Sequence, residues 1–286
     1  MSQRDEPLDS GFVSDIPKSR ALFEQLRQFH WEYYSALAYL RSRVYDSLKT
    51  SLRDRAKPFV FSKWQRAVKY KYALEPLGTN GSLVDPGGRF NIGEIDTTRY
   101  PVFPALYVAS DKGTALAELL GRTTSGTLLT PEEVALTKPD SIAAVSVSGH
   151  LEAVIDVCDG SDLGAFVALI KGFRLPSRLT SEARRLHFSI EIITTVPKLI
   201  EVLHAPNWRE WPTLYDTPAA SQIFGRISLD AQLDGILYRS VLTEKPSLAV
   251  FHQNFQNSSS YIELDDPAPP ELVRRRLDSS NCNPRV

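Results

Sequence analysis

Residues 87–118 read GGRFNIGEIDTTRYPVFPALYVASDKGTALAE, and this stretch holds the most informative pattern in the chain. Two adjacent glycines precede Arg89. Glycine reaches backbone conformations that other residues avoid, and it lets a ligand approach the chain closely. We therefore expect Arg89 on or beside a tight turn, with its planar guanidinium available to a phosphate or a carboxylate.

An apolar run at residues 105–109, which includes Tyr107, predicts a short buried strand. Ser110 or Asp111 is a suitable N-cap for a helix that follows it. The apolar residues of that helix recur on one face: Ala115, Leu116, Leu119 and Leu120. Glu118 lies beside this face, so its carboxylate is either a surface charge or a positioned functional group.

Two more blocks lie towards the C-terminus. Residues 217–225, TPAASQIFG, predict a short helix that ends near Gly225. Residues 234–240, DGILYRS, predict a strand that delivers Ser240 at its end. Residues 248–251, LAVF, predict a further strand that pairs nearby.

In this order, the three blocks resemble the RES-domain family, which is named for its arginine, glutamate and serine. Members typically carry a GGRW-like turn, a tyrosine-containing strand, a glutamate at the end of an A-x-x-E helix and a dG-I-x-x-x-S strand. The resemblance covers residues 59–263 in outline and is dense in the three blocks. Members also carry an arginine on an early strand. Arg66 matches it best, although Ala67 follows where many members have an aromatic residue. An ordinary cation on an edge strand is the alternative for Arg66.

The resemblance implies an α+β fold similar to that of ADP-ribosyltransferases, with a split pair of small β-sheets and surrounding helices. It also implies NAD as the substrate. Carried over by position, Arg89 and Arg66 would hold the diphosphate, and Tyr107 would line the nicotinamide–ribose pocket. Glu118 would stabilise the cationic sugar, and Ser240 would hydrogen-bond the ribose or a phosphate.

The residue types suit this chemistry in their own right. Arginines suit a diphosphate, and an aromatic face suits a flat heterocycle. A lone carboxylate suits the oxocarbenium-like sugar that forms when the nicotinamide–ribose bond breaks. We expect no metal, because the five histidines and two cysteines show no metal-binding spacing.

The acceptor of the ADP-ribosyl group stays open. Water would make the protein an NAD glycohydrolase, inorganic phosphate an NAD phosphorylase, and a side chain a protein ADP-ribosyltransferase. A catalytically silent nucleotide-binding module is a further alternative. The GGRF sequence of the turn, Ala67 and a long middle region favour it.

The region from residue 20 to residue 55 contains no proline or glycine and predicts one long helix, or two with a tight bend. Its apolar residues recur at steps of three and four: Leu22, Leu26, Phe29, Tyr33, Leu37, Leu40, Val44, Leu48 and Leu52. This stripe packs on the catalytic core, on a second copy of the chain in a homodimer, or on a partner. We expect a helical extension over residues 1–57, a RES-like catalytic domain over 58–265, and a tail over 266–286 that is a short helix or disordered.

The 286 residues carry a net charge of −1, which gives no support to a bulk electrostatic role in nucleic-acid binding. RES proteins are typically toxins neutralised by a small antitoxin, often with a helix-turn-helix part. The resemblance therefore implies such a partner, to which any DNA contact would fall. No apolar run is long enough to span a bilayer and no signal peptide is visible, so we expect a cytoplasmic protein.

Overall fold

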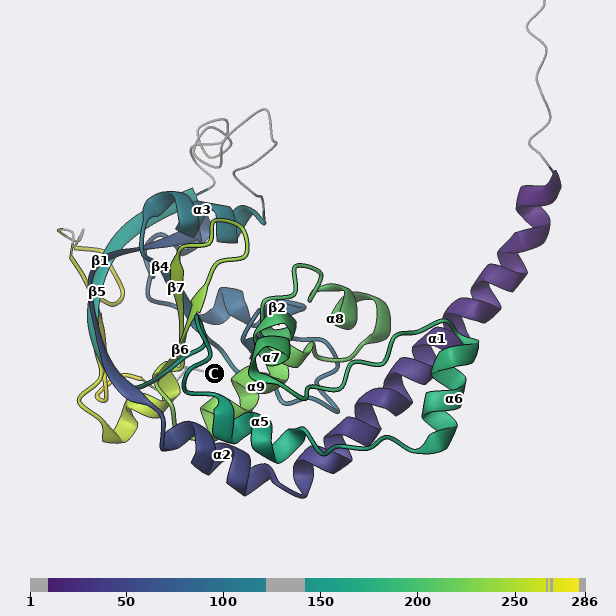
Figure 1. The fold of residues 1–286 in the computed structure, drawn as a ribbon. Helices are drawn as coiled ribbons and strands as arrows, with labels where there is room; N and C mark the ends of the chain where they lie inside the picture. Colours follow the sequence, from purple (N-terminus) through teal and green to yellow (C-terminus); the bar gives the residue numbers. More distant parts are fainter. Residues whose placement is uncertain (1–9, 122–141, 266, 268–269, 283–286) are drawn as a thin grey trace, which may run out of the picture. The chain divides into compact units, whose positions relative to one another are not determined.

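The computed structural model describes residues 10–121, 142–265, 267 and 270–282 (Figure 1). They form two compact units. The helical unit contains residues 10–43 and 173–192, and the sheet unit contains the other described residues. Helices combined with a largely antiparallel sheet make the fold α+β. None of the described helices is long and apolar enough to cross a membrane.

The helical unit contains α1 (Ser10–Ser42) and α6 (Ser177–Arg185). Phe29 and Tyr33, two members of the predicted apolar stripe, are buried. The centroids of their rings lie 5.1 and 5.9 Å from the centroid of the Phe188 ring. This part of the stripe therefore packs against residues of its own unit.

The long N-terminal helix ends at Ser42, and α2 (Tyr45–Arg53) follows as a separate helix of the sheet unit. Leu48 and Leu52, the last members of the stripe, are fully buried there. The prediction of two helices is therefore confirmed. The grouping differs from the expected extension over residues 1–57, because α2 belongs with the sheet and residues 173–192 belong with α1.

Seven strands of the sheet unit form one connected sheet in the order β1-β4-β7-β6-β5-β8-β9. β1 and β5 are long curved strands that lie side by side and pair from Lys57 opposite Val154 to Lys69 opposite Ile142 (Figure 1). β1 pairs with both β4 and β5, so the strands β1, β4, β7, β6 and β5 form a closed ring of pairings. The bounds of the strands are β1 (Lys57–Lys69), β4 (Leu106–Ala109), β5 (Ile142–Asp156), β6 (Gly235–Arg239), β7 (Pro246–Val250), β8 (Tyr261–Leu264) and β9 (Arg276–Leu277).

The sheet buries a hydrophobic core that β1, β4, β5, β7, β8 and β9 all supply. Leu106 and Val108 of β4 belong to this core. Successive side chains of a strand point to opposite faces, so Tyr107 between them points away from the core. The predicted strand at residues 105–109 is thus confirmed, and its alternation directs the tyrosine to the face where a cavity lies.

A separate ribbon of two strands, β2 (Gly87–Gly88) and β3 (Asn91–Ile92), carries the glycine pair. Gly88 pairs with Asn91, so Arg89 and Phe90 form the turn of the ribbon. The predicted position of Arg89 on a tight turn is therefore confirmed. We call residues 87–90 the GGRF turn.

The helices of the sheet unit gather on one side of the sheet, apart from α3 (Lys112–Leu120) (Figure 1). Besides α2, they are α5 (Gly164–Ile170), α7 (Val196–Leu203), α8 (Glu210–Tyr215) and α9 (Ala220–Asp230). The prediction that the last of these ends near Gly225 is wrong. A Cβ atom at Gly225 would lie 2.0 Å from the carbonyl oxygen of Phe90, so this glycine lets the helix pass against the GGRF turn.

β5 runs without interruption from Ile142 to Asp156 and contains Gly149. A glycine inside a strand often marks a bulge or a close approach of another backbone. A Cβ atom there would lie 2.6 Å from the Tyr261 carbonyl oxygen and 2.7 Å from the Phe61 ring, so the residue marks a close approach of backbones and not a turn.

The described strands form one connected sheet and a separate two-stranded ribbon, and the split pair of ADP-ribosyltransferase-like sheets stays a prediction.

The described part of the C-terminal tail adds β9 to the sheet, where Leu277 pairs with Ile262. Leu277 and Cys282 are buried, and the carbonyl oxygen of Cys282 lies 2.6 Å from Nδ1 of His252. The expectation of a short helix or disorder is therefore wrong for residues 270–282. Two apolar side chains in the core hold this segment in place.

Replacing Gly225 with alanine tests the contact between α9 and the GGRF turn. The added Cβ atom has no room beside the Phe90 carbonyl group, so we expect Gly225→Ala to lower the free energy of unfolding by about 1–3 kcal/mol, the usual cost of overpacking. Denaturant unfolding measures this. Gly164→Ala is the matched control, because a Cβ atom there meets nothing within 4 Å. Equal stability of the two variants would contradict the proposed packing role.

Candidate functional site

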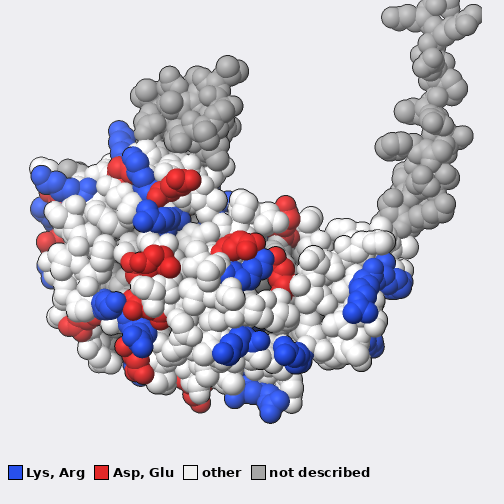
Figure 2. All heavy atoms as spheres, in the orientation of Figure 1, with Lys and Arg blue, Asp and Glu red and all other residues white. Residues whose placement is uncertain are grey.

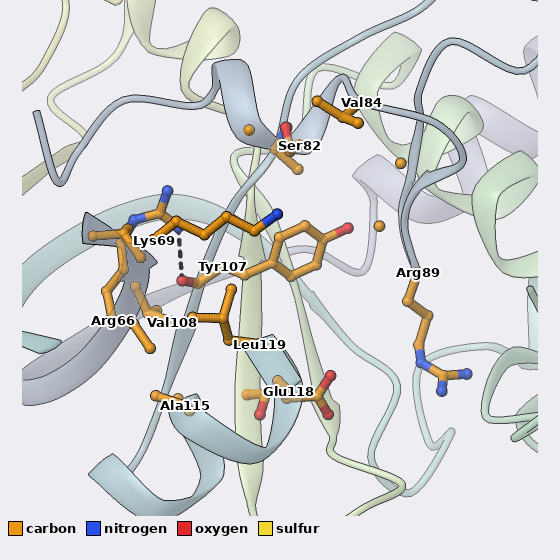
Figure 3. A pocket seen from close by; sticks show the side chains of 18 of the residues that line it. Arg66, Lys69, Ser82, Val84, Arg89, Tyr107, Val108, Ala115, Glu118 and Leu119 are labelled. Atoms are coloured by element: carbon orange, nitrogen blue, oxygen red, sulfur yellow. Dashed lines mark hydrogen bonds between the residues drawn. The ribbon is translucent and has the colours of Figure 1, made fainter. Parts of the chain in front are cut away.

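A cavity of about 480 Å³ lies beside the GGRF turn in the sheet unit (Figure 3). Arg66, Arg89, Tyr107 and Glu118 all line it, so the structure brings four of the five predicted site residues together. Ser240 does not line the cavity and is 1% exposed. The walls come from segments far apart in the sequence: the end of β1, residues 78–89, β4, α3, residues 206–209 and the ends of β6 and β7 with the residues between them.

The side chain of Asn91 fixes the GGRF turn from inside. Its Nδ2 atom donates to the carbonyl oxygens of Ser82 at 2.7 Å and Phe103 at 3.0 Å. Its Oδ1 atom accepts from the Gly88 amide and the Tyr107 hydroxyl, both at 2.9 Å. All four hydrogen-bonding positions of this buried amide are used, so the ribbon is tied to the strand that carries Tyr107.

Gln222 of α9 holds the same turn from the other side. Its Nε2 atom lies 2.8 Å from the Pro86 carbonyl oxygen, 3.2 Å from that of Gly88 and 3.0 Å from that of Asn91. Its Oε1 atom accepts from the Ala219 amide at 3.0 Å. Gln222 is fully buried, so its amide satisfies turn carbonyls that would otherwise lack a partner.

Tyr107 presents its ring to the cavity while its hydroxyl group is engaged elsewhere. The hydroxyl donates to Asn91 and accepts from the Phe90 amide at 3.0 Å. A Cβ atom at Gly88 would lie 2.4 Å from the hydroxyl oxygen, so only glycine lets the ribbon approach so closely. Burial raises the pKa of Tyr107, and the phenol stays neutral at physiological pH. The ring face, and not the hydroxyl, is what Tyr107 can offer a ligand.

Arg89 is buried and held by the backbone. Its Nη1 atom donates to the carbonyl oxygens of Leu203 at 3.1 Å and Ala205 at 3.0 Å, at the C-terminal end of α7. Burial lowers the pKa of Arg89, but an arginine stays charged at neutral pH. Both hydrogens of Nη1 are used, which leaves the edge formed by Nε and Nη2 for a bidentate bond to an anion.

Arg66 has three backbone acceptors. Nε donates to the Pro76 carbonyl oxygen at 2.6 Å, Nη1 to that of Tyr107 at 2.9 Å and Nη2 to that of Gly78 at 2.7 Å. Burial lowers the pKa of Arg66 to about 10. Since β1 pairs with β4 on one side and β5 on the other, the alternative of an ordinary edge-strand cation is wrong. Arg66 ties the loop at residues 76–78 to β4 and adds a positive charge to the cavity wall.

Glu118 reaches the cavity from α3, whose start is fixed by Asp111. The Asp111 side chain accepts from the Thr114 amide at 3.1 Å, which confirms one of the two predicted N-caps. The Ser240 hydroxyl donates to Oε1 of Glu118 at 2.5 Å and accepts from the Leu242 amide at 3.2 Å. Ser240 thus holds the carboxylate in one orientation, and its hydroxyl is directed at Glu118 and not into the cavity.

The cavity has charged and aromatic wall residues that the sequence analysis does not assign. Tyr238 is one of them, and its place two residues before Ser240 in a predicted strand is a signal that both share a face. Burial raises its pKa, and the charge of Glu118 adds to the effect. Lys69, Trp208 and Arg209 also line the cavity. Their local sequence gives no signal, because their positions depend on how distant segments pack.

The charges of the cavity wall are mostly positive. Five of its side chains are cationic and two are carboxylates: Arg66, Lys69, Lys71, Arg89 and Arg209 against Asp85 and Glu118. By contrast, Figure 2 shows basic and acidic side chains interspersed over the outer face in view. The local excess of positive charge favours an anionic ligand. In the described part of the chain, no group of three or more His, Cys, Asp or Glu side chains is placed to hold a metal ion.

Comparison with known proteins gives little beyond this geometry. No protein-family model and no curated protein matches the chain. Among solved structures, the crystal structure of the M. tuberculosis MbcT–MbcA toxin–antitoxin complex superposes with a TM-score of 0.41 and 14% sequence identity. The match covers 81% of this chain and 91% of that chain. Similarity at this level assigns neither a family nor a function.

Replacing Arg66 with lysine separates its structural role from a role in ligand binding. An ammonium group cannot reach three carbonyl oxygens in different directions, so we expect Arg66→Lys to lower the free energy of unfolding by about 2–3 kcal/mol. Chemical denaturation measures the change. Arg239→Lys is the control, since Arg239 is exposed and its hydrogen bond to the Glu244 carbonyl oxygen is long, at 3.4 Å. Unchanged stability with lost anion binding would contradict the structural role.

Proposed function

We propose that this chain cleaves the nicotinamide–ribose bond of NAD and acts as the toxin of a toxin–antitoxin pair. One observation carries the catalytic part. The Glu118 carboxylate, oriented by the Ser240 hydroxyl, lies in a cavity whose other charged groups are mostly cationic. Such a cavity suits a molecule that combines phosphate groups with a centre that becomes positively charged.

NAD has both properties. Its diphosphate suits the Nε–Nη2 edge of Arg89, and its flat nicotinamide ring suits the ring faces of Tyr107 and Tyr238. When the bond between C1′ of the ribose and the nicotinamide nitrogen breaks, the electron pair goes to the nitrogen and positive charge develops on the sugar. The Glu118 carboxylate would stabilise that charge. Nicotinamide leaves as a neutral molecule, so no general acid is needed.

The remaining residues of the site would hold these groups in place. Ser240 is a positioning residue for Glu118, since its hydroxyl contacts the carboxylate. Asn91 and Gln222 keep the GGRF turn in one conformation, so that Arg89 does not have to be ordered when the substrate binds. The acceptor then adds to C1′, and water, inorganic phosphate and a protein side chain all suit this step.

The biological part of the proposal rests on the resemblance of the sequence blocks to RES-domain toxins. It brings with it a small antitoxin protein with a helix-turn-helix part, a cytoplasmic location and a homodimer as proposals. A toxin of this kind would act by depleting cellular NAD. The antitoxin would then silence the site or block access to it.

The first test removes the charge of Glu118 while keeping its shape. We expect purified wild-type protein to release nicotinamide from NAD and Glu118→Gln to lower kcat by about 10²-fold or more, the scale for loss of an electrostatic stabiliser. The affinity for NAD, measured by calorimetry, should change little. Glu94→Gln is the matched control, because Glu94 is exposed and does not line the cavity. Wild-type turnover in Glu118→Gln would contradict the assignment.

The products of the same reaction identify the acceptor. Free ADP-ribose indicates water, its phosphorylated form indicates phosphate, and a labelled protein indicates an ADP-ribosyltransferase. If no nicotinamide is released with water, phosphate or protein as the acceptor, the alternative of a catalytically silent binding module is the one that stands. In cells, induced wild-type protein should lower NAD and stop growth, whereas Glu118→Gln should do neither.

The second test concerns Ser240. Ser240→Ala removes the hydrogen bond to Glu118, so we expect kcat to fall by about 10- to 100-fold while the affinity for NAD stays within about twofold, since the loss of one hydrogen bond to a charged group is about 1.5–3 kcal/mol. Ser240→Thr keeps the hydroxyl and serves as the control. A large loss of affinity in Ser240→Ala would show that the hydroxyl contacts the ligand itself.

A further inference from the structure

The segment between α7 and α8 brings a second arginine to the cavity. Pro206, Trp208 and Arg209 of this segment line the wall, more than a hundred residues away in sequence from the GGRF turn. Arg89 already contacts the start of the segment through the carbonyl oxygens of Leu203 and Ala205. Turn and segment are therefore held together by a buried arginine.

The indole ring of Trp208 lies near the guanidinium groups of both arginines. Its side chain is buried, and the Cζ atoms of Arg209 and Arg89 lie 4.7 and 5.8 Å from the centroid of its rings. A guanidinium over an indole ring gains about 0.5–1 kcal/mol at an exposed site, which favours a position of Arg209 at the wall of the cavity. Both guanidinium groups thus lie near the same indole ring.

The positive charges of Arg89 and Arg209 lie close enough to each other to interact. Burial lowers the pKa of Arg89 most; the negative charge of Glu118 opposes this effect, and the positive charge of Arg209 adds to it. Among the described residues, no carboxylate forms an ion pair with Arg209. The adjacent Glu210 instead accepts from Asn207 at 3.0 Å. Two cations that repel each other beside a cavity bind more favourably to an anion placed between them.

We propose that Arg209 and Arg89 together clamp a phosphate group of the ligand, with Trp208 as their shared support. Arg89 is pre-positioned by the backbone, and Arg209 is the exposed member that completes the clamp when the ligand enters. This inference deepens the proposed function, because it names the residue of this chain that adds to diphosphate binding. The charge of Arg209 would strengthen binding of the phosphate group without taking part in cleavage of the nicotinamide–ribose bond.

The test measures anion binding apart from catalysis. The probes are inorganic pyrophosphate and NAD, titrated by calorimetry into the full chain and into Arg209→Ala, Arg209→Lys and Arg209→Glu. We expect the alanine variant to bind both probes at least about tenfold more weakly, because a hydrogen bond to a charged group is lost. Arg209→Lys should recover part of the affinity through its charge, and Arg209→Glu should bind both probes more weakly than Arg209→Ala. Arg174→Ala is the matched control, since Arg174 is exposed and lies in the helical unit.

Kinetics and stability complete the test. If NAD is cleaved, Arg209→Ala should raise KM with kcat changed less than about threefold, the signature of lost ground-state binding. Unchanged affinity for both probes, or no binding of pyrophosphate by the wild-type protein, would overturn the clamp. A lower unfolding midpoint with unchanged affinity would also overturn it, because Arg209 would then only stabilise the fold. If NAD binds without being cleaved, the proposed reaction fails while weaker pyrophosphate binding in Arg209→Ala still supports the clamp.

Discussion

A single buried amide, that of Gln222, holds the GGRF turn against α9. The turn exposes several carbonyl oxygens to the protein interior, and buried carbonyl groups need hydrogen-bond partners. Nε2 of Gln222 faces three of them, and Gly225 one turn later lets the helix come close enough for these bonds to form. The position of Arg89, and with it one wall of the cavity, depends on this contact between a helix and a turn.

The charge of the cavity follows from how its arginines are satisfied. Arg66 and Arg89 make their hydrogen bonds to neutral carbonyl oxygens, so their geometry is fixed without a direct carboxylate partner. A carboxylate partner would have fixed them equally well but would have cancelled the positive potential. Within the cavity, the carboxylate of Glu118, which the Ser240 hydroxyl orients, serves the opposite requirement of a positive centre. The cationic groups and the Glu118 carboxylate therefore line one cavity without forming a direct ion pair among the described residues.

Local signals in the sequence predict the elements that carry the site. The strand of Tyr107, the Asp111 cap of α3 and the turn at Arg89 were predictable, because each depends on neighbours within a few residues. The direction of Ser240 towards Glu118 and the role of Gln222 were not, since each depends on a partner more than a hundred residues away. Gly225 misled for the same reason. It was predicted to end a helix, yet it permits a close approach to Phe90 that only the tertiary structure defines.

The five carbonyl oxygens around Arg66 and Arg89 have a consequence for how such a site changes over evolutionary time. Every amino acid supplies the same backbone oxygen, so the residues at positions 76, 78, 107, 203 and 205 make these contacts whatever their side chains are. A substitution that keeps the backbone in place therefore keeps these hydrogen bonds to the arginines. The hydrogen bonds that hold Arg66 and Arg89 can thus persist while the side chains around them change. Covariation between pairs of side chains would not reveal these contacts.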